Sequence, residues 1–349
     1  MGKISGSAMS VLGAIDPDKI GVTMMHEHLY LDVGVAFVPP QRPDEAHMSD
    51  AKVCLSNLGW IRINWTSNRD NLLLLDEDLM IREAHLYREA GGRTIVDTTS
   101  IGISRNPEAL VRISRATGLN VIMGTGYYVG QAHPPEFSSI SMEAVTEQIV
   151  RDVTEGVGGT GVRSGIIGEI GCSWPWTNNE KKSVAAAVAA QQETGATVLI
   201  HPGRDQRAPL EVLSFVEREG GDFSRTVMAH IDMRISDYGV LRETAATGVY
   251  MEFDGFGIDP GYPPHAPTTR FPSDHERIDM INVLLDEGRG DRILIAHDVC
   301  TKHRLREFGG HGMDHILRRV VPWMKMTGIS DEQLDAMLVQ NPRRLLTII

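Results

Sequence analysis

Short apolar runs rich in β-branched residues recur along the chain, and most of them end in a polar residue. Each run is followed by a longer stretch with the spacing of a helix. This pattern predicts eight buried strands that alternate with helices. The predicted strands are residues 20–28, 93–100, 120–128, 164–171, 197–203, 226–232, 249–255 and 292–298.

The stretches between these runs predict helices, and many of them end in glycine, the usual residue at a helix C-terminus. The predicted helices are residues 76–92, 106–118, 141–156, 179–195, 209–220, 236–248 and 273–288. Ser273 and Glu276 have the spacing of a capping box at the start of the last of these. Two more helices, 311–328 and 330–348, are predicted after the eighth strand.

Eight strands that alternate with helices predict a (β/α)₈ TIM barrel in the α/β class. The alternative, a doubly wound sheet, usually has fewer strands and a glycine-rich nucleotide loop after the first, which this sequence lacks. We expect residues 1–349 to form a single barrel domain, because nothing in the sequence resembles a linker or a short repeat. The longest irregular stretch, at about residues 30–75, is interpreted as a loop insertion that partly covers the site.

Composition and charge narrow the possible partners. The 349 residues are 42% hydrophobic and 23% charged, with a net charge of −12, which disfavours nucleic acids and anionic membranes and favours a small-molecule substrate. The three cysteines are far apart, which argues against a disulfide framework or a zinc ribbon. Residues 1–15 lack the apolar core of a secretory signal and no apolar run has membrane-spanning length, so a cytoplasmic location is expected.

Polar side chains gather at the ends of the predicted strands, where TIM barrels carry their active sites. His26 and His28 are two positions apart, so both rings point into the same space. Two imidazoles placed together are costly unless they bind something, and a metal ion fits best. The other strand-end candidates are Asp97, Glu169, His201, His230, Asp232, Asp254, His297 and Asp298.

On the eighth strand, alternation allows only one of His297 and Asp298 to face the lumen. A hydrated metal site favours a carboxylate, so we assign Asp298 inward and His297 toward the helices. Six residues are then candidate metal ligands: His26, His28, Glu169, His201, His230 and Asp298. These nitrogen and oxygen donors suffice for two divalent ions, for which zinc is favoured over manganese, iron or cobalt. Such a pair would hold a hydroxide ready for nucleophilic attack.

Several segments of the sequence resemble the phosphotriesterase family of the amidohydrolase superfamily, and in particular its phosphotriesterase-related branch. They are "HEH" at residues 26–28, "GIIGEIGCSWP" at 165–175, "HPGR" at 201–204, "AHDVCTKHRL" at 296–305 and "GGHGMDHIL" at 309–317. The resemblance implies a binuclear metal-dependent hydrolase acting on an ester, lactone, amide or phosphoester. Family members are often dimers, so it also suggests a homodimer.

The resemblance further implies a role for each ligand. His26 and His28 would hold the more buried ion with Asp298, which would also be the general base. His201 and His230 would hold the more exposed ion.

The bridging ligand departs from the bacterial phosphotriesterases, which use a carboxylated lysine. Gly168 occupies that position here, so the neighbouring Glu169 is expected to bridge, as in the phosphotriesterase-related branch. Because glutamate is shorter, the strand must shift or bulge to deliver it. Replacing the lysine by glutamate makes efficient phosphotriester hydrolysis doubtful, whereas metal binding is still expected.

Substrate contacts are less well determined by the sequence. Tyr128 could line the pocket or pack in the core, and Arg204 could bind a carboxylate, sulfonate or phosphate or be a solvated loop residue. Arg204 and a glutamate-bridged site together favour a small N-acylated amino or sulfonic acid as substrate. Asp97, Asp232 and Asp254 are interpreted as supports of the ligands. The alternative function is a barrel that binds metal and ligand without turnover.

Overall fold

The structure is a computed structural model that describes residues 5–349. Residues 1–4, which belong to the segment 1–15 that was considered as a secretory signal, lie outside the described residues. Eight short parallel strands form its centre, and each lies within one of the predicted runs. They are β3 (Thr23–Glu27), β6 (Thr94–Asp97), β7 (Asn120–Met123), β8 (Ile167–Gly171), β9 (Val198–His201), β10 (Thr226–Met228), β11 (Tyr250–Phe253) and β12 (Ile293–Ile295).

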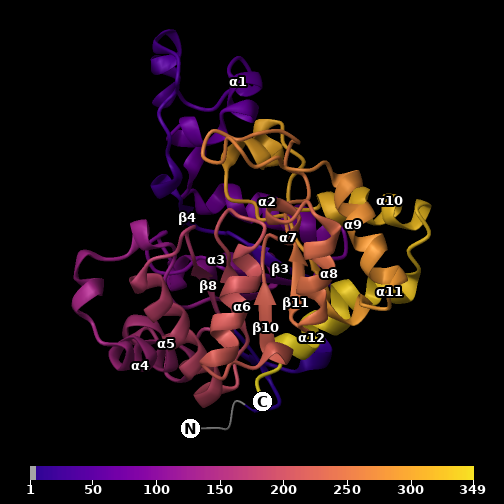
Figure 1. Ribbon diagram of the computed structural model, residues 1–349. Coiled ribbons are helices and arrows are strands. Elements are labelled where there is room, and N and C mark those ends of the chain that lie inside the picture. The colour runs from indigo at the N-terminus through magenta and orange to yellow at the C-terminus, as the bar shows by residue number, and fades with distance from the viewer. Residues whose placement is uncertain (1–4) are drawn as a thin grey trace.

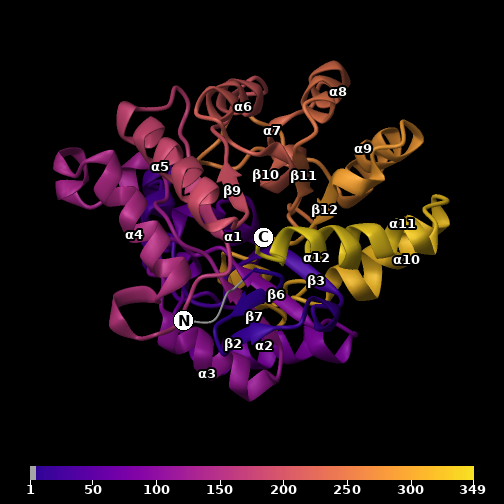
Figure 2. The same cartoon turned by 90° about the horizontal axis from the view of Figure 1, so that it is seen from below.

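These strands close into a barrel. One arc has the order β3-β6-β7 and the other β8-β9-β10-β11-β12, with parallel neighbours throughout. Backbone hydrogen bonds join the arcs on both sides, from Asp298 to His26 at 3.1 Å and from Gly168 to Thr125 at 2.6 Å. Helices surround the strands when the molecule is seen along its axis (Figure 2). The predicted (β/α)₈ TIM barrel is confirmed.

Seven helices lie where the sequence predicts them between successive strands. They are α2 (Glu77–Glu89), α3 (Pro107–Thr117), α4 (Met142–Thr154), α5 (Asn178–Thr194), α6 (Ala208–Arg218), α8 (Tyr238–Ala246) and α9 (Asp274–Asp286). The capping box of Ser273 and Glu276 is present at α9. Gly118 and Gly195 end α3 and α5 in the left-handed conformation that glycine adopts without steric cost.

The C-terminal helices differ from the prediction in their details. The helix predicted from residue 311 begins only at Ile316. It starts with a π-helical turn, Ile316–Val320, that leads into α10 (Val321–Met326), and a second π-helical turn, Ala336–Gln340, joins α11 (Asp331–Asp335) to α12 (Asn341–Leu346). Pro322 and Pro342 follow these turns. Because proline has no N–H to donate to the i−4 carbonyl, the regular helical pattern is interrupted there.

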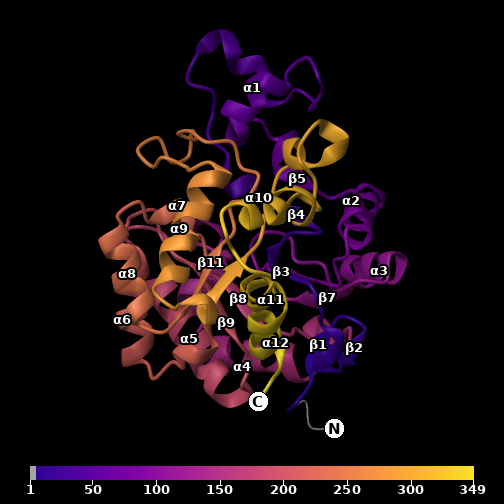
Figure 3. The ribbon, with the colours of Figure 1, turned by 90° about the vertical axis from the view of Figure 1, so that its right-hand side faces the viewer.

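Two further strand pairs and a short helix lie outside the barrel. The hairpin of β1 (Ala8–Ser10) and β2 (Gly13–Ile15) lies near the N-terminal ends of the strands, close to both termini (Figure 3). Residues 30–75 lie at the opposite end, where they contain α1 (Leu58–Ile63) and the pair of β4 (Leu31–Asp32) with β5 (Leu73–Leu74) (Figure 1). Short 3₁₀ helices make it a folded segment, and Leu31, Val33, Ala36 and Trp65 line a cavity at this end of the barrel, so we call residues 30–75 the folded cover.

The lower part of the barrel is filled by apolar side chains. Met25, Val96, Leu199 and Leu294 belong to one fully buried cluster, which Leu345 of α12 also joins. A solid interior at this end leaves the carboxyl ends of the strands as the place for polar side chains. Among residues 5–349, no helix is both long and apolar enough to cross a membrane.

Candidate metal centre

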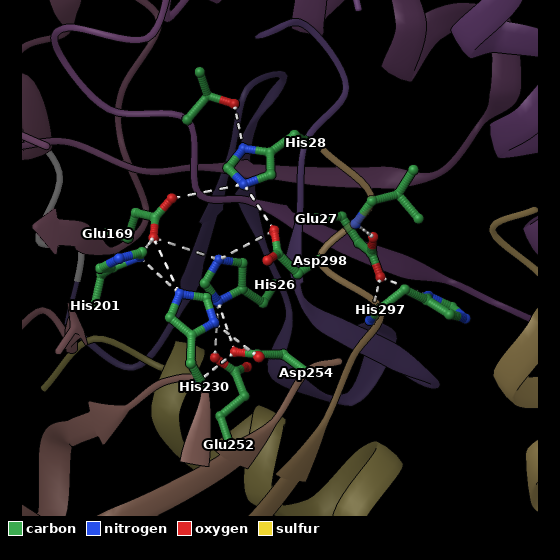
Figure 4. A network of polar contacts seen from close by, with 12 residues as sticks. His26, Glu27, His28, Glu169, His201, His230, Glu252, Asp254, His297 and Asp298 are labelled. Atoms are coloured by element: carbon green, nitrogen blue, oxygen red, sulfur yellow. Dashed lines mark hydrogen bonds and ion pairs between the residues drawn. The ribbon is translucent and has the colours of Figure 1, made fainter. Parts of the chain in front are cut away.

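The structure brings all six predicted ligands together at the carboxyl ends of the strands (Figure 4). Five of them are buried, and the side chain of Asp298 is 14% exposed. His26 lies in β3, Glu169 in β8 and His201 at the end of β9. Asp298 points inward beside them, whereas His297 points toward the helices, where its Nε2 accepts a hydrogen bond from the backbone of Ile316.

The six side chains form two groups of potential ligand atoms. His26, His28 and Asp298 make one group, with 3.2 Å from His28 Nε2 to Asp298 Oδ1 and 4.0 Å from His26 Nε2 to the same oxygen. Glu169, His201 and His230 make the other. These groups correspond to the two ion sites that the resemblance implies.

Glu169 lies between the two groups. Its Oε2 is 2.9 Å from Nδ1 of His201 and 3.6 Å from Nε2 of His230. The same oxygen is 3.7 Å from Nε2 of His26, and Oε1 is 3.6 Å from Nε2 of His28. A carboxylate that faces both groups has the position of a bridging ligand.

The outer nitrogens of three histidines are held by hydrogen bonds. Nδ1 of His26 lies 3.0 Å from Glu252 and 3.3 Å from Asp254, and Nδ1 of His230 lies 2.8 Å from Asp254. Nδ1 of His28 lies 2.9 Å from the hydroxyl of Thr99. Such partners fix the tautomer and orientation of a ligating imidazole and leave Nε2 free to bind.

One nitrogen in the centre has no partner. Nε2 of His26 is completely buried and makes no hydrogen bond, although it faces the carboxylates of Glu169 and Asp298. An unpaired buried polar atom costs about 1–3 kcal/mol. A divalent cation would satisfy it, and the surrounding imidazole and carboxylate donors are those that zinc and related metals prefer. The residues present therefore fit a metal centre.

The pKa values of His230, His201 and Glu169 in the metal-free protein reflect the carboxylates and imidazoles around them. Burial lowers the pKa of His230, but Asp254 and Glu169 outweigh it and raise that pKa to about 9. Burial and the neighbouring His230 lower the pKa of His201 to about 3, despite the contact with Glu169. Burial alone would raise the pKa of Glu169, yet hydrogen bonds from His201, His230 and His26 bring it well below its usual range. The centre thus stabilises positive charge among its carboxylates.

Unusual backbone conformations aim three of these residues. His230 and Asp298 adopt positive φ angles of 57° and 52°, which non-glycine residues rarely do outside functional sites. Between Ile167 and Ile170 the pairing of β8 with β9 shifts in register, as the sequence predicts for delivery of Glu169. Gly168 has φ +139°, and a Cβ there would lie 2.4 Å from the carbonyl oxygen of Leu199.

A cavity of about 60 Å³ is lined by five of the six residues, all except His26. Both predicted substrate contacts, Tyr128 and Arg204, line it, and the ring of Tyr128 packs edge-on against His201 at 5.1 Å. The lining residues that were not predicted include Trp65, Arg234 and His265. They come from loops and from the short helix α7 (Ile231–Arg234), where hydrophobic periodicity carries no information about the site.

The predicted supporting acids have separate roles. Asp254 holds His230 and His26, as described, and Asp97 accepts the backbone N–H of Leu29 at 2.6 Å. Asp232 instead pairs with the buried Arg277 at 2.6 Å. Glu252 was missed, although it lies two positions before Asp254 on the same face of β11 and alternation could have identified it.

The basic cluster after β12 does not reach the centre. Lys302 pairs with Asp70 at 2.9 Å, and the backbone of His303 donates to Asn71. Arg304 donates to backbone carbonyls, including that of Phe256 at 2.8 Å. Lys302 and His303 thus fasten the loop after β12 to residues 30–75, and none of the three basic residues lines the cavity beside the metal centre.

Comparisons with known proteins agree with this geometry. The sequence profile described as the phosphotriesterase family matches residues 6–346. A phosphotriesterase-related protein of Nematostella vectensis is 46% identical and covers 98% of this chain and 99% of its own. Proteins named N-acetyltaurine hydrolase in Danio rerio and Homo sapiens are 45% and 41% identical, each covering 99% of both chains.

Solved structures give the same result. A resiniferatoxin-binding protein from Rhodobacter sphaeroides superposes with a TM-score of 0.94 at 36% identity, covering 98% of this chain and 95% of its own. The phosphotriesterase homology protein from Escherichia coli, solved with phosphate in its active site, gives a TM-score of 0.78 at 26% identity, with 94% and 99% coverage. The chain belongs to the phosphotriesterase family, as its sequence motifs predict.

Proposed function

We propose that this hydrolase is a binuclear metal enzyme that cleaves the amide bond of a small N-acylated amino acid or amino sulfonic acid. The observation that carries the proposal is the cage of six donors around a buried, unpartnered Nε2 of His26. The close relatives named N-acetyltaurine hydrolase support an amide as the scissile group. The glutamate at the bridging position argues against phosphotriesters as the main substrates.

In the proposed reaction, His26, His28 and Asp298 would hold one divalent ion and His201 and His230 the other, with Glu169 shared. The ions would polarise the scissile carbonyl and lower the pKa of water, most suitably as zinc. Water adds to the carbonyl carbon, the C–N bond breaks, and the acid and the free amine leave.

Asp298 is the proposed proton carrier. Its side chain is the most exposed of the six, and one of its oxygens faces both His26 and His28. It can therefore accept the proton of the attacking water and deliver it to the departing amine nitrogen. Because burial excludes solvent from the other five donors, the proton has a single carboxylate through which to move.

The test combines metal analysis with turnover. Purified protein is loaded with zinc, manganese or cobalt, its metal content is measured, and N-acetyltaurine, a lactone, a carboxylic ester and a phosphotriester are offered. We expect two ions per chain and the highest kcat/KM for the amide, with Asp298→Asn retaining fold but losing about 10²-fold or more in kcat. Two bound ions without turnover above Asp298→Asn would favour the ligand-binding alternative, and absence of stoichiometric metal would refute both.

Location and oligomeric state remain predictions. A cytoplasmic homodimer with a small-molecule substrate and no nucleic-acid or membrane partner is consistent with the acidic composition. Sedimentation of the purified protein and cell fractionation would check these two points independently of the reaction.

A further inference from the structure

Two arginines lie side by side at the boundary between the inner cavity and a second, polar cavity. The second cavity has a volume of about 300 Å³ and is lined in part by Thr268, Thr269 and Arg270. Arg204 and Arg234 line both cavities. A molecule that extends from the metal centre into the second cavity would lie against these two guanidinium groups.

Arg234 is buried without a carboxylate partner. Only 5% of the residue is exposed, yet among residues 5–349 no acidic group lies within ion-pair distance of it. Its Nε donates to the carbonyl of Pro202 at 3.0 Å, and one terminal nitrogen lies 3.4 Å from Nε2 of His201. A buried charge is normally paired or fully hydrogen-bonded, so this arginine has unused donors.

Other buried arginines of the chain show what is missing. Arg277 pairs with Asp232 at 2.6 Å, and Arg105 pairs with Asp152 at 2.8 Å. Arg225 and Arg304, like Arg234, are buried without a carboxylate, but each donates to three backbone carbonyls. Arg234 has neither a carboxylate nor a comparable set of carbonyls, so its terminal nitrogens are available to an anion.

Arg204, at the cavity mouth, also lacks a partner. It is exposed, and within the part of the chain that the structure describes it makes no hydrogen bond or ion pair. Both guanidinium groups line the same two cavities. Two adjacent cations without an intervening anion repel each other, and an oxyanion between them removes that cost.

We propose that Arg234 and Arg204 bind the sulfonate or carboxylate of the substrate while its acyl group enters the inner cavity. This inference rests on the proposed amide hydrolysis and specifies its substrate class. The inner cavity of about 60 Å³ has room for a few water-sized groups, which restricts the acyl group to a short chain such as acetyl. Arg234 contacts the outer nitrogen of His201 while the inner nitrogen faces Glu169, so one imidazole ring separates this guanidinium from the bridging carboxylate, which favours a short spacer between amide and anion.

The test compares a charged substrate with a neutral one of the same shape. N-acetyltaurine is paired with its methyl sulfone analogue, in which a methyl group replaces one sulfonate oxygen. For Arg234→Met and Arg204→Met we expect kcat/KM for N-acetyltaurine to fall about tenfold or more, mainly through KM, and the preference over the sulfone to fall by a similar factor. Arg234→Lys should recover part of the preference.

The matched control is Arg207→Met. Arg207 lies three residues after Arg204 but points away and pairs with Glu243, so its loss should leave the substrate preference unchanged. Circular dichroism and metal content establish that each variant is folded and loaded. Because Arg204 is exposed and uncontacted, Arg204→Met keeps the test decisive if Arg234→Met loses metal. An unchanged preference in Arg204→Met and in every loaded Arg234 variant would overturn the inference.

A binding measurement separates this inference from the proposed function. Calorimetric titration of metal-loaded protein with ethanesulfonate should show binding that weakens about tenfold or more in Arg234→Met or Arg204→Met and persists in Arg207→Met. If no amide is cleaved but this pattern is found, the anion site stands and the reaction is wrong. If amides are cleaved but ethanesulfonate binds wild type and variants equally, the anion site is wrong.

Discussion

Asp254 joins the two halves of the metal centre through a single carboxylate. It accepts the backbone N–H of His230 at 2.9 Å and its ring Nδ1 at 2.8 Å, and it lies 3.3 Å from Nδ1 of His26. Burial would raise the pKa of Asp254, but His230 and His26 hold it below its usual range, so the group is ionised. The variant Asp254→Asn preserves the shape of this side chain and removes its charge.

The magnitude follows from the two ring contacts. A hydrogen bond to a charged group contributes about 1 kcal/mol more than a neutral one, so losing the charge opposite both rings costs about 2 kcal/mol. The cost is shared, about 1 kcal/mol for each ion, so the affinity for each ion should weaken about fivefold and the product of the two affinities about 30-fold. Glu252→Gln changes one contact, to His26, and should weaken mainly the His26–His28 site, by about fivefold.

The assay is zinc binding at controlled free metal, set by a competing chelator, with the number of ions per chain measured at each step. The control Asp314→Asn alters an equally buried acid that pairs with Arg306 and Arg318 outside the centre. Wild-type affinity in Asp254→Asn would refute the reasoning. An equal loss in Asp314→Asn would show that general destabilisation, not imidazole orientation, is the cause.

Three further outcomes can be measured. Gly168→Ala should displace Glu169 and lower bound zinc below two ions per chain, because the new Cβ would lie 2.4 Å from a backbone oxygen; full zinc content would contradict this. Removing the metal with a chelator should lower the calorimetric Tm by roughly 4 °C for each bound ion, if the free metal concentration before chelation was a hundred times the Kd. An unchanged Tm would argue against a resident metal. Hydrogen bonding by His315 and the charge of Arg277 outweigh burial and lower the pKa of Asp274 to about 2. Its ionised form therefore stabilises the fold above about pH 4, and this contribution of about 2 kcal/mol is lost as pH falls toward 2. Asp274→Asn should flatten the decline of unfolding free energy between about pH 4 and pH 2, and parallel declines would contradict the assignment.

The strands and the ligand set could be predicted because both depend on local alternation. A period of two places His26 and His28 on one face, and barrel geometry places every strand end at the same mouth. The same rule places Glu252 on the face of Asp254. Glu252 was missed because it lies inside the predicted strand and not at its end.

The cavity walls could not be predicted in this way. Arg234 ends a four-residue helix, and Trp65 and His265 come from loops far apart in sequence that meet only through tertiary packing, with ring centroids 4.4 Å apart. Loop conformation depends on contacts that no periodicity encodes.

The folded cover over the barrel mouth comes from a different part of the chain than the ligands. Residues 30–75 supply Trp65 to the cavity and are tied to the loop after β12 by Asp70 and Asn71. None of the six donors lies within this segment, and only His26 and His28 are near it in sequence. The segment that controls substrate entry and the residues that carry out the reaction can therefore change independently of each other. Homologues could exchange this segment to admit a different molecule while retaining the same reaction, and a graft of it between relatives would transfer selectivity rather than catalytic power.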